Sequence, residues 1–142
     1  RRSSDLKLHI YTDSDISQLH NVINCGVADS VRMTPKIFHC SKINLNMTSK
    51  TIQSGIPLRV FDVLGVGGFL ITNYQPEIGD FFTPGEDLVV FEDIKDMQYK
   101  IKYYLEHEEE RIAIARHGHE TVCNNYTYDI MLKKIFEIAG VI

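Results

Sequence analysis

Two charged residues interrupt an apolar segment of the chain, and they are the first candidates for ligand chemistry. The segment "PLRVFDVLG", Pro57 to Gly65, predicts a helix because proline fits only the first helical turn and glycine can end a helix. Only Arg59 and Asp62 break its apolar character. Since they stand three residues apart, they share one face of the predicted helix.

The chain before this helix provides a second candidate feature. The stretch "NLNMTSKTIQSGIP" leads from the end of a predicted strand to the helix N-terminus. Free backbone N–H groups and the positive end of the helix dipole make such a terminus a favourable place for an anion. We therefore expect an anion site where this stretch meets the helix.

An ion pair within the helix is the alternative role for Arg59 and Asp62. A cation near the N-terminus with an acid behind it opposes the helix dipole, and such pairs contribute only about 0.2–0.5 kcal/mol even in the better orientation. A desolvated charge costs several kcal/mol unless it has a partner. We favour the interpretation in which the pair lies on a buried helix and faces a ligand, and the ion pair stays open as the competitor.

A glycine cluster, Gly65, Gly67 and Gly68, follows the same helix. A dinucleotide-binding fingerprint places its glycines after a strand and before a helix, and here the order is reversed. The glycines more simply end the helix and allow it to pack closely on the following strand. The cluster is therefore weak support for phosphate binding.

Strands alternate with helices along the chain, and the last third is helical. This order predicts an α/β fold: a Rossmann-like parallel sheet with helices on both faces. Ligands of such sheets bind outside the carboxyl ends of the strands. The predicted strands are Leu6–Tyr11, Asn21–Gly26, Lys42–Thr48, Phe69–Thr72 and Asp87–Phe91, and the predicted caps of later helices are Asp93 and Thr127.

Length and composition limit the classes of function. The 142 residues, 44% hydrophobic and 24% charged, fit one globular domain covering residues 1–142. A net charge of −4 with no basic stripe argues against nucleic-acid binding. The longest apolar run, Val63–Ile71, is too short for a transmembrane segment. Three cysteines without a CxxC pair favour a reducing compartment, so we expect a cytoplasmic protein.

Histidines in "RIAIARHGHE" raise the possibility of a metal site. His117 and His119 point to different faces of a helix and cannot easily share a metal ion. Zinc sites use histidines four residues apart or pairs of cysteines. We therefore expect no metal site here and a solvated helix surface, with Arg111 supported by nearby acids.

Five stretches together resemble a known enzyme family. They resemble, in order, the C-terminal half of group-1 glycosyltransferases of the spore-maturation (CgeB-like) type, and the resemblance runs from about Leu6 to about Ile138. Such enzymes have the GT-B architecture, in which two Rossmann-like domains enclose the active site and the C-terminal one holds a nucleotide-sugar donor. The stretches are "SKINLNMT", "SGIPLRVFDVLGVGGFLITN", "PEIGDFFTPGEDLVVFED", "YYLEHEEERIAIARHG" and "NNYTYDIML".

The resemblance implies roles for particular residues. Asp62 stands where the wider group has a carboxylate that holds the ribose, as aspartate in place of the commoner glutamate. Ser54 replaces a glutamate near the donor sugar, while the backbone at Gly55 and Ile56 would meet the diphosphate. Arg59 would neutralise that diphosphate as the catalytic group. Further donor contacts are implied at Thr12 and Asp13 after the first strand and at the loop acid Glu77.

The resemblance also implies the reaction and the partners. A sugar would move from the nucleotide to an acceptor hydroxyl, and the leaving diphosphate would be stabilised without a metal or other cofactor. The general base would lie in an N-terminal GT-B domain of the same protein. The chain opens without a methionine, so we expect a fragment of a two-domain enzyme that binds donor weakly and is inactive alone.

Two other functions stay open. A receiver-like signalling domain also has acids after its first strand, as in "TDSD", but it needs an aspartate at the end of a central strand and a lysine at the end of a later one. The corresponding stretches here, "NLNMT" and "LITNYQ", have neither. A degenerate Rossmann-like module kept for folding or association is consistent with Ser54 in place of the glutamate.

Overall fold

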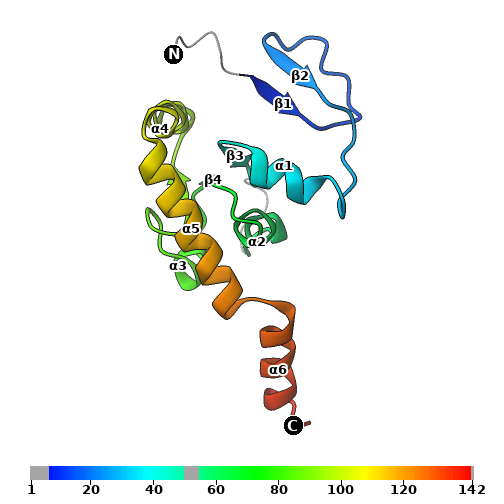
Figure 1. Cartoon of the computed structure of the whole chain (residues 1–142), viewed down its shortest axis with the longest axis vertical. Helices are drawn as coiled ribbons and strands as arrows, with labels where there is room; N and C mark the ends of the chain where they lie inside the picture. The colour runs from blue at the N-terminus through cyan, green and yellow to red at the C-terminus, as the bar shows by residue number, and fades with distance from the viewer. Residues whose placement is uncertain (1–6, 50–54, 142) are drawn as a thin grey trace. The chain divides into compact units, whose positions relative to one another are not determined.

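The computed structural model describes residues 7–49 and 55–141, and it divides the chain into two compact units, residues 1–34 and 35–142. In the first unit, β1 (Leu8–Ile10) pairs in parallel with β2 (Val22–Asn24), as drawn in Figure 1. Both strands fall within predicted ones. The loop between them contains the predicted donor residues Thr12 and Asp13.

The second unit contains a three-stranded parallel sheet in the order β3-β4-β5. The predicted strands are confirmed, although each is shorter than its prediction or shifted by a residue. The described strands lie in two sheets, whereas we expected one. The strands are β3 (Asn44–Asn46), β4 (Leu70–Asn73) and β5 (Val89–Phe91). Helix α1 (Thr34–Cys40) precedes β3, α2 (Leu58–Gly65) connects β3 to β4, and α3 (Ile78–Phe81) lies between β4 and β5.

Both faces of this sheet are covered, as the continuous apolar run of β4 predicted. Alternate residues along a strand point to opposite faces. Leu70 accordingly packs with α2, while Phe69 and Ile71 pack with the helices that follow β5, which are α4 (Ile94–Glu106) and α5 (Glu108–Asn125). The predicted α/β fold class, with parallel strands and helices on both faces, is confirmed.

Helix α2 is amphipathic, which corrects our expectation of a buried helix. Val60, Val63 and Leu64 are buried, whereas Leu58 is 63% exposed. The helix ends at Gly65, as predicted, but the left-handed residue is Gly67, with φ of 75°. Its N–H donates to the Leu64 carbonyl over 2.9 Å, so the reversal into β4 occurs two residues after the expected position.

Helices α4 and α5 cover one face of the sheet. The predicted cap is confirmed, since the Asp93 carboxylate accepts a hydrogen bond from the Asp96 N–H over 2.9 Å. Lys100 joins α4 to β5 because its Nζ donates to the Val90 carbonyl over 2.6 Å. The prediction that Arg111 lies on a surface is wrong: Arg111 is 8% exposed, and its guanidinium reaches the loop before β3.

The last helix, α6 (Tyr128–Ile138), extends from the end of α5 away from the sheet (Figure 1). The predicted cap is again confirmed, with the Thr127 hydroxyl accepting from the Ile130 N–H over 3.4 Å. None of its residues is buried, including Leu132 and Phe136. In the described part of the chain, no helix is both long and apolar enough to cross a membrane.

Candidate functional site

The N-terminus of α2 lies at the end of the sheet where the sequence predicted a ligand. Because β3 and β4 are parallel and α2 connects them, α2 begins at the carboxyl ends of the strands and ends at their amino ends. Pro57 is the N-cap, and it makes no side-chain hydrogen bond to the first turn. Among the described residues, the terminal N–H groups therefore lack the N-cap side-chain acceptor that usually caps a helix.

Gly55 has a backbone conformation that other residues rarely adopt. Its φ is 94°, and a Cβ placed on it would meet no atom within 4 Å. The glycine is therefore required by the turn and not by a close neighbour. Gly55 and Ile56 directly precede the N-cap of α2, and Gly55 is exposed whereas Ile56 is half-buried. Ser54, the replacement for the family's glutamate, lies outside the described residues.

Arg59 and Asp62 are both exposed on α2, and they do not form an ion pair with each other in the described part of the chain. The competing interpretation, an intrahelical ion pair, therefore does not describe this structure. Neither charge forms an ion pair with any described residue. Their predicted roles toward a donor stay predictions.

The carboxyl ends of β3 and β4 are joined by side-chain hydrogen bonds. The Thr48 N–H donates to Asn73 Oδ1 over 2.7 Å, and Asn46 Nδ2 donates to Thr72 Oγ1 over 3.1 Å. Three of these four residues end or follow a strand, where the backbone groups no longer pair with a neighbouring strand. These bonds hold the edge of the sheet next to α2 in a defined geometry.

Two acceptor oxygens at this edge are buried without a hydrogen-bond partner. They are Oε1 of Gln75 and Oε2 of Glu77, and no described residue donates to either. A buried acceptor without a donor costs about 1–3 kcal/mol. Glu77 was a predicted site residue, and it is the N-cap residue of α3. Gln75 was missed, although a polar side chain directly after a buried strand was the available signal.

Aromatic side chains bring α2 and α3 together. The Phe61 ring lies 5.2 Å from the Phe82 ring and 6.0 Å from the Phe81 ring, and Tyr126 contacts all three. Such aromatic contacts add roughly 0.5–1.5 kcal/mol each beyond the area that they bury. The helix carrying Arg59 and Asp62 is thus packed against the segment that carries Glu77.

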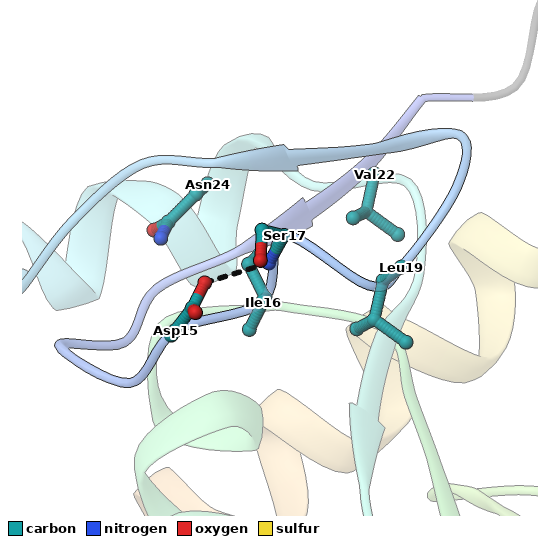
Figure 2. A pocket seen from close by; sticks show the side chains of 6 residues that line it. All are labelled: Asp15, Ile16, Ser17, Leu19, Val22 and Asn24. Atoms are coloured by element: carbon teal, nitrogen blue, oxygen red, sulfur yellow. Dashed lines mark hydrogen bonds between the residues drawn. The ribbon is translucent and has the colours of Figure 1, made fainter.

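The first unit has a hollow of its own after β1. Its volume is about 350 Å³. Figure 2 shows the side chains that line it, which are Asp15, Ile16, Ser17, Leu19, Val22 and Asn24. The Asp15 carboxylate accepts a hydrogen bond from the Ser17 N–H over 2.9 Å. Hydrogen bonds from the backbone and the side chain of Ser17 lower the pKa of Asp15. The predicted residues Thr12 and Asp13 do not line it. The Thr12 hydroxyl oxygen accepts from the Ser14 N–H over 3.0 Å, and Asp13 is exposed.

The two histidines expected on a solvated helix surface also make hydrogen bonds to other segments. His117 Nδ1 lies 2.7 Å from Asp87 Oδ1, and His119 Nδ1 lies 3.2 Å from the Leu64 carbonyl oxygen. The His117 side chain is 53% exposed, as expected, whereas His119 is half-buried. The partners of both lie outside α5, which the helical spacing alone cannot show. Among residues 7–49 and 55–141, no three side chains of the metal-binding types are grouped around a common point.

Comparison with known proteins identifies the family. The glycosyl transferase-like family matches residues 4–137, which is most of the chain. This chain is a member of that family. The membership agrees with the resemblance found in the sequence, at the level of glycosyltransferases in general. No curated protein matches the chain.

A solved structure supports the fold of this family member. The crystal structure of a glycosyltransferase from Rickettsia africae ESF-5 aligns with a TM-score of 0.66 at 17% sequence identity. The alignment covers 84% of this chain and 31% of that one. The family member thus has the fold of one part of a larger glycosyltransferase. At this identity the likeness concerns the fold alone.

Proposed function

We propose that this chain is the donor-binding domain of a glycosyltransferase that moves a sugar from a nucleotide-sugar to an acceptor hydroxyl. The observation that carries the proposal is the N-terminus of α2, where the N-cap Pro57 makes no side-chain bond, at the carboxyl ends of β3 and β4. Arg59 and Asp62 are exposed on the same helix. Family membership supports the same class of reaction. Ligands of parallel sheets bind at this end.

The anionic part of the donor would bind at the helix terminus. In sugar transfer, the bond between the sugar C1 and the diphosphate oxygen breaks, a bond from C1 to the acceptor oxygen forms, and the acceptor proton passes to a base. Negative charge develops on the diphosphate as it leaves. The backbone N–H groups of Gly55 and Ile56, those of the first turn of α2 and the guanidinium of Arg59 would stabilise that charge, which makes Arg59 the catalytic residue of this domain.

The hydroxyl groups of the nucleotide-sugar need hydrogen-bond acceptors on the protein. Asp62 would accept hydrogen bonds from the ribose hydroxyls. The buried Oε2 of Glu77 has no hydrogen-bond partner among the described residues, which supports a role near the nucleotide-sugar. A hydroxyl group of the ligand would supply the missing hydrogen bond. The donor contacts expected of Thr12, Asp13 and Ser54 stay predictions.

The rest of the enzyme is also part of the proposal. An N-terminal GT-B domain would supply the general base and bind the acceptor, and the whole would be a cytoplasmic enzyme of the spore-maturation type. The solved relative is about three times as long as the part that this chain matches, which is consistent with a second domain. We therefore expect residues 1–142 to form a single donor-binding domain that binds nucleotide weakly and turns over no substrate alone.

Calorimetric titration of the folded chain with uridine, guanosine and thymidine diphosphates tests the proposal. We expect one nucleotide to bind, and Asp62→Ala to abolish the heat. Glu120→Ala is the matched control, because Glu120 is an exposed acid on α5 and its removal changes the net charge equally. Chelation with EDTA should leave the affinity unchanged, since Arg59 and the helix terminus replace a metal.

Silence across the whole panel in a folded sample would contradict the proposal. Binding that survives Asp62→Ala undiminished would contradict the assigned site. Silence across the panel would favour a structural Rossmann-like module.

A further inference from the structure

A cavity of about 310 Å³ lies at the opposite end of the sheet from the proposed donor site. It adjoins the residues just before β3 and β4 and the helix-to-strand turn after α2, so it is at the amino ends of the strands. Its ionisable lining residues are basic, and three apolar side chains complete the wall. The lining residues are His39, Ser41, Gly67, Phe69, Arg111, Ile112, Ala115, Arg116 and His119.

Arg111 places a permanent charge at the wall of this cavity. The residue is 8% exposed, and Nη1 donates to the Lys42 carbonyl over 2.9 Å. Nη2 lies 3.4 Å from Glu108 Oε1, but the Glu108 side chain is 63% exposed and does not line the cavity. Nε is buried and has no partner among the described residues. The buried guanidinium is therefore only partly compensated.

Arg116 adds a second permanent charge five residues further along α5. It is exposed, and it forms no ion pair with any described residue. Five residues correspond to a rotation of roughly 140° around a helix, so the two arginines leave α5 in different directions, yet both line this cavity. Like charges in one place repel unless an anion lies between them.

The two histidines complete this basic surface. His39 Nδ1 lies 2.7 Å from the Val66 carbonyl oxygen, and His119 Nδ1 lies 3.2 Å from the Leu64 carbonyl oxygen. A carbonyl only accepts, so each Nδ1 carries a proton and donates. These bonds satisfy carbonyls at the negative end of α2, which would otherwise repel an anion. Nε2 of His119 lies 3.6 Å from Cys123 Sγ.

The charge balance of the cavity contrasts with that of the whole chain. The chain has a net charge of −4, yet no acidic residue lines this cavity. Clustered arginines and histidines recognise phosphate groups through charge and several N–H donors. Ile112, which is 53% exposed, offers an apolar surface to the body of a ligand.

We propose that this cavity binds the phosphate group of a small phosphorylated molecule. The site is separate from the donor site, because its residues lie at the amino ends of the strands. It does not depend on the proposed function. Capping of backbone carbonyls by basic side chains is the competing explanation, and it predicts no ligand.

Titration of the isotope-labelled chain with inorganic phosphate, followed by ¹H–¹⁵N NMR at constant ionic strength, tests the proposal. We expect saturable shifts of the Gly67, Phe69 and Ile112 amides and of the Arg111 Nε–H signal. Glycerol 3-phosphate should bind at least as well, whereas acetate and chloride should not saturate these shifts. Specific phosphate recognition by two arginines cannot be replaced by a single negative charge.

Arg116→Gln is the test variant, because Arg116 is exposed and its loss should not disturb folding. We expect it to weaken phosphate binding about tenfold. Arg32→Gln removes the same charge from an exposed arginine that belongs to neither proposed site, and it is the matched control. Equal weakening by both variants, or shifts that never saturate, would overturn the proposal.

The same spectra keep this proposal apart from the proposed function. A nucleoside diphosphate bound at α2 should move the Gly55 and Ile56 amides, whereas phosphate in the basic cavity should move Gly67 and Phe69. Phosphate shifts confined to Gly55 and Ile56 would show that the ion binds only at the donor site, and the cavity proposal would fail while the donor proposal stood.

Discussion

His117 Nδ1 lies 2.7 Å from Asp87 Oδ1, and the two residues are thirty positions apart in the chain. Asp87 is buried and precedes β5, whereas His117 lies in the middle of α5. The Thr121 hydroxyl donates to the same oxygen over 2.7 Å, and the Thr83 N–H donates to the other oxygen over 2.7 Å. One carboxylate thus fixes the position of α5 against the loop that leads into the sheet.

This carboxylate should make stability depend on pH. Burial by itself raises the pKa of Asp87, but the hydrogen bonds from Thr121, Thr83 and His117 outweigh burial, and the pKa is lowered. A lowered pKa in the folded state stabilises the fold above the unfolded-state pKa, which is about 4, and that stabilisation is lost as the pH falls through the folded-state value. Asp87→Asn should therefore cost about 1–3 kcal/mol at pH 7.

The difference between wild type and Asp87→Asn is the quantity to measure, by urea unfolding between pH 7 and about pH 2. We expect it to be largest at neutral pH and to shrink below about pH 4. A difference that stays constant over this range would show that the ionised carboxylate is not what stabilises the contact.

Gly118 sits where α5 passes closest to the Asp87 loop. A Cβ placed there would overlap the Asp87 carbonyl oxygen and lie 3.0 Å from Leu64 Cδ2. Because the clash is with backbone, it cannot be relieved by a side-chain rotation. We expect Gly118→Ala to cost more than about 3 kcal/mol in the free energy of unfolding.

Gly79→Ala is the control for this substitution. Gly79 lies in α3, and a Cβ there would meet no atom within 4 Å. Alanine should be neutral or stabilise by up to about 1 kcal/mol. If thermal unfolding showed equal effects for the two substitutions, the close approach at Gly118 would be refuted.

A substitution at Gln75 should affect the free energy of unfolding and nucleotide binding differently. It is 6% exposed, and its Oε1 is buried without a described partner. Replacing it with methionine, which has a similar shape, removes an unsatisfied acceptor and should leave stability unchanged or raise it by about 1 kcal/mol. If this oxygen serves the donor, Gln75→Met should weaken nucleotide binding about tenfold.

Chemical denaturation and calorimetry on the same preparation check both parts. Gln75→Met with lowered stability and unchanged nucleotide affinity would assign Gln75 to the fold alone.

The two helix caps should differ in their effect on global stability. Asp93→Ala removes the cap of α4, which packs on the sheet, and should cost about 1 kcal/mol in the free energy of unfolding. Thr127→Ala removes the cap of α6, which has no buried residue, and should reduce helical content with little change in the unfolding midpoint. Circular dichroism and urea unfolding measure the two effects. An equal loss of midpoint would mean that α6 is packed in solution.

Local patterns in the sequence were sufficient to predict the helices and strands of this protein. The apolar run of β4, the capping residues Asp93 and Thr127, and the helical order of the last third each depend on neighbours within a few residues. Rules of local geometry therefore predicted the parallel α/β fold and placed the N-terminus of α2 at the ligand end of the sheet.

Contacts between segments that are distant in the chain could not be predicted from local sequence patterns. The burial of Arg111, the His117–Asp87 bond and the unpartnered oxygen of Gln75 each depend on which segment lies opposite, and only the tertiary structure decides that. The sequence also suggested a buried α2, whereas the sheet covers only one of its faces and leaves Leu58, Arg59 and Asp62 exposed. A helix presents every side chain at its surface, and the packing of its neighbours determines which of them meet solvent.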